Sequence, residues 1–272
     1  MPLRVMPWCK RWQPEDSVVI VTGASSGIGR ELCKLLVARG ASVIASARRE
    51  ERLEALAQEC QSLAGMKHRL QTVAGDITDH ATRARLTELA SDMGGGKLDL
   101  LVNNAGVGAL GPFASATPER LRRIMEVNFF APVELARLAL PLLCRGRAPV
   151  MCNVSSVLGH RAVPDKSEYC ASKFALHGWS DAVRAEWRPH GIQVTLVSPS
   201  TTESEFFDSV IDTTADQVSK SFGRWPAESV ARATLSVITA RRSEAILSLG
   251  GKALVYADRL TPPVVNFILA KK

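Results

Sequence analysis

The sequence predicts a single-domain α/β fold, in which a doubly wound, mostly parallel sheet carries helices on both faces. Short runs rich in Val, Ile and Leu alternate with longer segments of helical periodicity along almost the whole chain of 272 residues. Uninterrupted runs of this kind are typical of strands buried on both faces. Helices between successive strands supply the crossovers that parallel pairing needs. The chain length suits one domain with a full hydrophobic core.

The first strand and helix show this pattern most clearly. A β-branched run at Ser17–Val21 leads through a Gly-rich turn into a helical pattern at Gly27–Arg39. The start of the long helical pattern within Thr117–Leu143 is marked by Thr117, a good N-cap residue, followed by Pro118, which suits the first turn. Further strands are expected at Ser42–Ser46, Leu70–Ala74, Leu98–Asn103, Pro149–Val154, Gln193–Val197 and Ala245–Leu249. Further helices are expected at Glu50–Ser62, Thr78–Asp92, within Thr117–Leu143, and at Ser167–Trp187 and Pro226–Arg241.

The two ends of the chain differ from this alternation. Residues 1–16 are basic and lack the apolar core of a signal peptide, which predicts a loose leader. The folded domain is expected at 17–249, followed by an apolar tail at 250–272 that Pro262-Pro263 divides. Neither half of the tail is long enough to span a bilayer. Three alternatives stay open for the tail: packing on its own domain over the substrate opening, contact with another subunit, or a place in a membrane interface.

Composition argues against several classes of protein. An apolar fraction of 46% and a charged fraction of 22% are ordinary for a soluble globular domain. The net charge is +7, but the basic residues are dispersed, whereas nucleic-acid readers concentrate them, so no nucleic-acid partner is expected. The six cysteines include no Cys-x-x-Cys pair, so neither a disulfide framework nor a bound metal is expected. Reduced thiols predict a cytoplasmic protein, with peripheral membrane contact left open by the tail.

The turn after the first strand has the features of a phosphate-binding loop. A pyrophosphate needs backbone N–H groups, a helix N-terminus and no side chains in its way. The three glycines of the turn would supply, in order, a tight turn, a close approach to the phosphates and a close contact between helix and strand. The predicted cofactor contacts in this turn are Gly23, Ser25, Ser26, Gly27, Ile28 and Gly29.

Further motifs follow in order along the chain. Asp76 comes after the third predicted strand, Asn103-Asn104-Ala105-Gly106 closes the fourth, and Asn128 lies in the long central helix. Ser156 follows the fifth strand, and Tyr169-x-x-x-Lys173 lies on the next helix. With the Thr-Gly-x-x-x-Gly-x-Gly turn, this series resembles the short-chain dehydrogenase/reductase family over about residues 17–250. The resemblance implies a Rossmann-type catalytic domain, a nicotinamide-dependent oxidoreductase, and a homodimer or homotetramer assembled through the helices bearing Asn128 and Tyr169.

The same resemblance implies which residues outside the Gly-rich turn contact the cofactor. In the family the acidic residue at the position of Asp76 meets the adenine. Ser200 departs from the pattern, because relatives usually have a glycine there, and a serine has less backbone freedom than a glycine beside the nicotinamide. The implied contacts are Asp76, Ile77, Asn104, Ala105, Gly106, Tyr169, Lys173, Pro199 and Thr202.

The end of the second strand indicates which nicotinamide cofactor is used. NAD enzymes usually place an acid there to accept the ribose hydroxyls. This chain reads Ala-Ser-Ala-Arg48-Arg49, with no acid before Glu50. A planar guanidinium matches the oxygens of a 2′-phosphate, and a similar turn in family members points to NADP(H). We therefore predict NADP(H), bound through Arg48, in preference to NAD(H). The alternative is that both arginines only begin a surface helix.

The spacing of Tyr169 and Lys173 has a chemical rationale. Residues four apart project from the same face of a helix, and a nearby ammonium is expected to lower the tyrosine pKa from about 10. By resemblance, Tyr169 is the general acid/base, and Lys173 also binds the nicotinamide ribose. In close relatives the catalytic serine lies thirteen residues before the tyrosine, so the resemblance implies that Ser156, rather than Ser155, holds the substrate oxygen. Asn128 either anchors a water in a proton relay or satisfies buried backbone with its amide.

The segment at about 200–225 is the expected substrate lid. Aromatic and aliphatic residues among its polar ones favour a hydrophobic substrate, and lids of this kind exclude water when they close. The predicted function is hydride transfer between NADP(H) and the carbonyl, or the primary or secondary alcohol, of a small molecule. Two alternatives are a nucleotide-binding regulatory or scaffold protein with little turnover, and an epimerase or dehydratase on the same fold.

Overall fold

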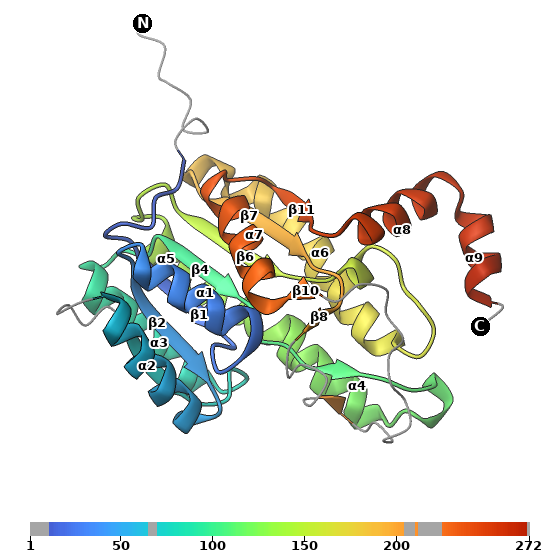
Figure 1. Cartoon of the computed structure of the whole chain (residues 1–272), viewed down its shortest axis with the longest axis horizontal. Coiled ribbons are helices and arrows are strands. Elements are labelled where there is room, and N and C mark those ends of the chain that lie inside the picture. Colours follow the sequence, from blue (N-terminus) through green and yellow to red (C-terminus); the bar gives the residue numbers. More distant parts are fainter. Residues whose placement is uncertain (1–10, 65–69, 204–209, 212–224, 271–272) are drawn as a thin grey trace, which may run out of the picture.

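The fold is built around one seven-stranded sheet whose strand pairings are all parallel. The structure is a computed structural model that describes residues 11–64, 70–203, 210–211 and 225–270. The strand order is β11-β7-β6-β4-β1-β2-β3, which confirms the predicted doubly wound α/β class (Figure 1). The strands are β1 Val18–Thr22, β2 Ser42–Ala47, β3 Leu70–Ala74, β4 Leu100–Asn103, β6 Val150–Val154, β7 Gln193–Ser198 and β11 Glu244–Ile246.

Helices cover both faces of this sheet and connect its strands. The helices are α1 Gly27–Ala38, α2 Glu50–Ala64, α3 His80–Gly94, α4 Pro118–Met125, α5 Ala131–Leu143, α6 Ser167–Trp187, α7 Ala227–Thr239, α8 Leu249–Leu260 and α9 Pro262–Ala270. Short 3₁₀ turns are η2 Phe113–Ser115, η4 Val157–Gly159 and η5 Arg188–His190, and η3 Glu126–Phe130 is a π-helix. Four two-residue strands lie outside the main sheet: β5 Gly108–Ala109, β8 Thr202–Glu203, β9 Val210–Ile211 and β10 Trp225–Pro226.

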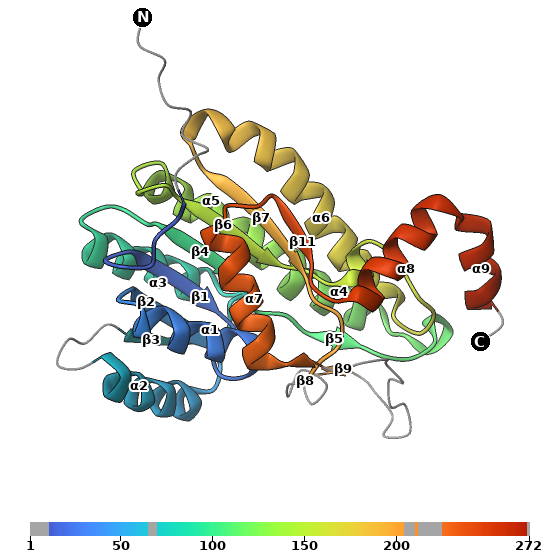
Figure 2. The same ribbon diagram turned by 45° about the horizontal axis from the view of Figure 1, so that its top comes forward.

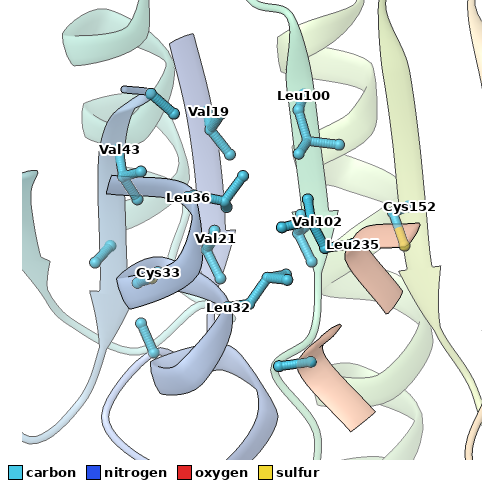
Figure 3. Close-up of a cluster of buried hydrophobic side chains, with 14 of the residues drawn as sticks. Val19, Val21, Leu32, Cys33, Leu36, Val43, Leu100, Val102, Cys152 and Leu235 are labelled. Atoms are coloured by element: carbon cyan, nitrogen blue, oxygen red, sulfur yellow. The ribbon is translucent and has the colours of Figure 1, made fainter. Parts of the chain in front are cut away.

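Alternation along β1 divides the core between the two faces of the sheet. Val19 and Val21 belong to the cluster that contains Leu32 and Leu36 of α1 and Leu235 of α7 (Figure 3). Val18 and Ile20 of β1 belong to a second cluster, together with side chains from α3, α5 and α6. Successive side chains of a strand point to opposite faces, so a strand between two helical layers is apolar throughout. All five residues of β1 are accordingly buried.

The direction of the crossovers locates the site. From β1 the chain adds β2 and β3 on one side, and β4, β6, β7 and β11 are then added on the other side. The order therefore reverses between β1 and β4. In open sheets of this type, ligands bind at the carboxyl ends of the strands beside such a switch point. The turns that follow β1 and β4 are the Gly-rich turn and the Asn-Asn-Ala-Gly segment.

The central helix predicted within Thr117–Leu143 is divided. Thr117 caps α4 as expected, because its side chain accepts a hydrogen bond from the Arg120 amide, and Pro118 occupies the first turn. The π-helix Glu126–Phe130 then separates α4 from α5. Its i→i+5 hydrogen bonding is a local deviation that apolar periodicity does not reveal, and such segments occur often at functional sites. Asn128 lies inside it.

The expectation of a loose leader is wrong for its last residues. Trp12 is only 1% exposed and belongs to the core cluster between β1, α1 and α7. Its backbone amide donates to the carbonyl of Thr239 at the end of α7. Burial of a large indole is strongly favourable, so this part of the segment packs on the domain. Residues 1–10 lie outside the described residues.

The tail forms two helices, α8 and α9, which extend away from the sheet at one end of the molecule (Figures 1 and 2). Val255 packs on Val157 and Ile246, and Asp258 forms an ion pair with Arg161 at 2.8 Å. The outer surface is apolar, with Leu260 and Phe267 among its exposed side chains. Within the described part of the chain, no helix is both long and apolar enough to cross a membrane. Most of the predicted lid, 204–209 and 212–224, lies outside the described residues.

Candidate active site

A cavity of about 1210 Å³ opens at the carboxyl ends of the strands. It brings together nearly all of the side chains that the sequence predicted for the site. Gly29 and Asn128 are the two predicted residues that do not line it. The predicted residues on its wall are Gly23, Ser25, Ser26, Gly27, Ile28, Arg48, Asp76, Ile77, Asn104, Ala105, Gly106, Ser156, Tyr169, Lys173, Pro199 and Thr202.

The Gly-rich turn has the geometry that an anionic phosphate group requires. Gly23 and Gly27 have φ values of +68° and +55°, a region that favours glycine. Ser26 is the N-cap of α1 but makes no side-chain cap hydrogen bond, and the first turn carries no acid. The amide groups at this helix start therefore suit an anion at the cavity wall. This donor set fits the pyrophosphate of a dinucleotide cofactor.

Gly29 has a packing function in the same turn. A Cβ atom added to it would lie 2.4 Å from the carbonyl oxygen of Gly23 and 2.5 Å from Nδ2 of Asn104. The side-chain amide of Asn104 donates to the backbone carbonyls of Thr22 at 2.9 Å and Gly23 at 3.1 Å. Thr22 Oγ1 in turn accepts from the backbone amides of Asn104 and Ala105, both at 3.0 Å. These bonds hold the turns after β1 and β4 together, so Asn104 shapes the cavity wall as well as lining it.

Two arginines follow β2 at the edge of the cavity. Arg48 is exposed, as is expected of a cation on an open wall. Arg49, which sequence reasoning left without a role, also lines the cavity, and its guanidinium donates to the hydroxyls of Ser25 and Ser26 at 3.1 Å each. The wall residues at the end of β2 and directly after it are Ser46, Ala47, Arg48 and Arg49, and none of these four is an acid.

Asp76 is held by its neighbours at the end of β3. Its carboxylate accepts from the amide and the hydroxyl of Thr78 at 2.9 and 2.8 Å and pairs with Arg123. Burial acts to raise the pKa of Asp76, but the hydrogen bonds from Thr78 and Arg123 outweigh it, so the pKa lies below its ordinary value. Arg123 also lines the cavity and is a second wall cation that the motifs did not indicate.

Ser156, Tyr169 and Lys173 meet at the inner end of the cavity. Ser156 is the N-cap of η4, where its Oγ accepts from the Leu158 amide at 3.1 Å, and it also hydrogen bonds to the Tyr169 side chain. Lys173 donates to the Val154 carbonyl at 3.0 Å, and its Nζ lies 5.7 Å from the centre of the Tyr169 ring. The start of η4 thus places the hydroxyl of Ser156 next to the phenol of Tyr169 on α6, and the amine of Lys173 lies one turn further along the same helix.

The acid–base balance of this group differs from the sequence-based expectation. Burial raises the pKa of Tyr169 to about 12, although its hydrogen bond with Ser156 acts to lower it. Burial also lowers the pKa of Lys173 to about 8. The expected lowering of the tyrosine pKa by the ammonium is therefore absent in the chain by itself, because removing both groups from water disfavours both charged forms. The phenol of Tyr169 therefore keeps its proton near neutral pH.

Asn128 and Ser155 lie behind this group. Asn128 accepts from the Val107 amide at 2.9 Å and donates to the Val107 carbonyl and the Ser172 hydroxyl, both at 3.0 Å. Its side-chain amide thus satisfies buried backbone, which is one of the two roles the sequence left open. The hydroxyl of Ser155 is buried and finds no hydrogen-bond partner among the described residues.

Part of the cavity wall away from the Gly-rich turn is apolar. It includes Leu110 after β5, side chains of η4, Trp225 of β10, and residues of the two tail helices. The tail therefore contributes to the cavity wall, through Leu254 of α8 and Leu269 of α9. The large apolar side chains in this part are Leu110, Val157, Leu158, Val163, Trp225, Leu249, Leu254 and Leu269, and the polar residues Asp165, Lys166 and Ser248 lie among them in the chain.

Comparison with known proteins places the chain in a family. The short chain dehydrogenase family matches residues 17–215. Dehydrogenase/reductase SDR family member 7B of Bos taurus is 30% identical, over 99% of this chain and 85% of the relative. L-xylulose reductase of Bos taurus is 38% identical, over 66% of this chain and 70% of the relative.

Solved structures agree with this result. A short chain dehydrogenase from Burkholderia cenocepacia in complex with NADP has a TM-score of 0.78 at 27% identity, covering 94% of this chain and 98% of its own. A short chain dehydrogenase/reductase from Burkholderia phymatum in complex with NAD has a TM-score of 0.82 at 22% identity, covering 93% and 96%. With its family match, its parallel sheet and its site at the strand ends, this chain belongs to the short-chain dehydrogenase/reductase family of oxidoreductases.

Proposed function

We propose that the protein transfers a hydride between NADP(H) and the carbonyl or alcohol carbon of a hydrophobic small molecule. The observation that carries this proposal is the meeting of Ser156, Tyr169 and Lys173 on the wall of the same cavity as the Gly-rich turn. One cavity can therefore bind the cofactor and the substrate together. The helix start would bind the phosphates of the cofactor, while Tyr169 and Ser156 would contact the oxygen of the substrate.

The side chains divide the proton chemistry between them. When bound, the nicotinamide ring supplies or accepts the hydride. In the reductive direction, Tyr169 donates its phenolic proton to the substrate oxygen, and Ser156 holds that oxygen as charge develops on it. The ammonium form of Lys173 then stabilises the phenolate that remains. In the oxidative direction the phenolate takes the proton back from the alcohol.

The preference for NADP(H) rests on the two arginines after β2. Solved neighbours include complexes with NAD and with NADP, so membership of the family leaves the choice open. Arg48 and Arg49 line the cavity where an enzyme for NAD would carry an acid. A pair of guanidinium groups offers several donors to a 2′-phosphate, whereas a ribose hydroxyl gains little from them.

The preference for a hydrophobic substrate rests on the cavity wall near the tail. Leu254 and Leu269 bring apolar side chains from two helices to the cavity wall, which also includes the η4 residues Val157 and Leu158. Ligand sites of this kind are mostly apolar, with a few polar groups that fix orientation. One of the relatives is named for a sugar, L-xylulose, so this preference is argued from the wall and not from the family.

Assembly into a homodimer or homotetramer is part of the proposal. Phe130, at the end of the π-helix, and Phe174 of α6 are 47% and 44% exposed, on the two helices expected to meet another subunit. Exposed aromatic side chains are typical of interfaces. Sedimentation velocity of the wild type and of Phe174→Asp tests this, and a wild-type monomer contradicts it.

Cofactor choice is tested by titrating the purified protein with NADPH and with NADH, read by nicotinamide fluorescence. The expected result is tighter binding of NADPH, which weakens selectively in Arg48→Ala and Arg49→Ala. Arg85→Ala, on the exposed face of α3, is the matched control and leaves both affinities unchanged. Equal binding of both nucleotides in all variants would overturn the NADP(H) preference. Binding without single-turnover hydride transfer to any ketone or aldehyde would favour the regulatory alternative.

A further inference from the structure

Three side chains that could hold a cation meet behind the catalytic serine. His160 follows η4, His177 lies on α6 and Glu244 begins β11. One donor atom from each lies within 4.8 Å of the others. Nε2 of His160 is 3.4 Å from Oε1 of Glu244, and Nε2 of His177 is 4.0 Å from Oε2 of the same carboxylate. The imidazole rings meet edge to face with their centres 4.5 Å apart.

We propose that His160, His177 and Glu244 form a binding site for a divalent transition-metal ion of the zinc type. Two imidazoles and one carboxylate are ligands that such ions use, with a water molecule able to take a fourth position. Two ligands about 2.1 Å from a tetrahedral ion lie about 3.4 Å apart. The distance from His160 Nε2 to Glu244 Oε1 already has this value. The three donor atoms lie within 4.8 Å of one another, so the side chain of His177 must move toward the other two for a tetrahedral ion to bind all three.

The surroundings of the His177 ring support the same assignment. A ligating histidine usually donates its second ring N–H to a carbonyl or carboxylate, which fixes the ring and leaves the other nitrogen for the metal. Nδ1 of His177 lies 3.4 Å from the carbonyl oxygen of Gly159, which leaves Nε2 directed at Glu244 and Asp181. The His160 side chain is nearly fully buried, and its Nδ1 has no hydrogen-bond partner among the described residues. Its Nε2 lies 2.9 Å from the Ser198 hydroxyl and 3.4 Å from Glu244, so an ion bound at Nε2 would replace the contact with Ser198.

Charge around the cluster also suits a cation. The carboxylates of Glu244 and Asp181 face the two imidazoles, whereas Arg259 of α8 is the positive group that acts on His160.

The position of the cluster indicates what the ion would do. Ser156 is the N-cap of η4, and His160 is its C-cap residue. Glu244 lies on β11, the three-residue edge strand of the sheet. A bound ion would therefore connect η4, α6 and the edge strand, next to the serine that holds the substrate oxygen. We expect it to stabilise the fold and the position of η4, without contact with the substrate.

The test uses the untagged full-length chain after treatment with a chelator. A background carrying Cys9→Ser and Cys144→Ser removes thiols that would compete for zinc. Calorimetric titration with Zn²⁺ is expected to show one ion per chain and a rise in the unfolding temperature. Loss of a supporting partner alone weakens metal affinity about 10–100-fold, so His177→Gln and Glu244→Gln are each expected to weaken it at least about tenfold. His190→Gln, an exposed histidine on η5, is the control and is expected to change nothing.

Co²⁺ provides a second readout that is independent of activity and of stability. Its absorption spectrum in the protein should show nitrogen and oxygen ligands without thiolate charge transfer, and the bands should be lost in the His177→Gln variant, whose folding is checked by circular dichroism. Absence of Zn²⁺ binding to the folded wild type would overturn the proposal. So would binding of equal affinity in the Glu244→Gln and His177→Gln variants, which would place the ion elsewhere.

Discussion

The guanidinium of Arg120 and the carboxylate of Glu168 form an ion pair with both side chains at most 3% exposed. Nε and Nη2 of the arginine donate to Oε1 at 3.0 and 2.7 Å, and Ser167 donates to Oε2 at 2.7 Å. Burial acts to raise the pKa of Glu168, but the bonds from Ser167 and Arg120 outweigh it and lower the pKa. The pair connects α4 with the first turn of α6, where Glu168 directly precedes Tyr169.

Removing one partner of this pair should be far more harmful than removing both. Arg120→Met leaves a buried carboxylate without its cation, which costs about 3–5 kcal/mol of unfolding free energy, whereas apolar replacement of both partners is often neutral. We expect Arg120→Met/Glu168→Met to recover most of the loss, as measured by urea denaturation. Arg85→Met, at an exposed pair with Glu88, should change stability by less than about 1 kcal/mol. A double variant as unstable as the single one would contradict this account.

Tyr169→Phe tests the proton donor. Positioned general acid–base groups contribute about 10²–10⁴-fold to rate, so turnover should fall by at least that lower factor while NADPH binding persists. The control is Tyr256→Phe, because the chain has two tyrosines and the other lies exposed on α8. Steady-state kinetics with a ketone substrate measures the effect. Full turnover by Tyr169→Phe would show that another group delivers the proton.

Lys173 should destabilise the fold at neutral pH. Its folded pKa of about 8 lies below the ordinary 10.5, so the unfolded chain binds more protons between these values and stability rises with pH across that window. Tyr169 acts oppositely, because its folded pKa of about 12 makes stability fall between about pH 10 and 12.

Lys173→Met should therefore abolish turnover and raise the free energy of unfolding at pH 7 by up to about 3 kcal/mol. Denaturant titration at pH 7 measures this against Lys97→Met, at an exposed position. The gain should shrink as the pH approaches 10. A variant that is less stable than the wild type at pH 7 would mean that the bond from Lys173 to the Val154 carbonyl outweighs burial of the charge.

Gly29→Ala should deform the Gly-rich turn. The added methyl group meets the backbone carbonyl of Gly23, which cannot move aside as a flexible side chain could. Overpacking of this kind costs about 1–3 kcal/mol, and nucleotide binding should weaken together with stability. Thermal unfolding and NADPH titration measure the two effects. Gly250→Ala, where a Cβ atom has open space, should retain wild-type stability, and equal losses in both variants would refute the packing argument.

The sequence by itself determined the class of fold, the order of its strands and helices, and the family. These depend on local patterns: apolar runs predict buried strands, and the glycine spacing of the first turn predicts a phosphate loop. The residues named from those patterns line one cavity because parallel strands deliver their carboxyl ends to the same edge of the sheet.

Only the tertiary structure decided which distant groups meet. Trp12 is buried because α7 packs beside α1, and Arg120 pairs with Glu168, which is 48 residues away in the chain. His160, His177 and Glu244 come from three separate elements, so no spacing in the sequence predicts their meeting. The direction of the Tyr169 pKa is also tertiary, because it depends on how completely packing removes the phenol from water. Periodicity records which residues are apolar, whereas burial and partners depend on chain segments far away in sequence.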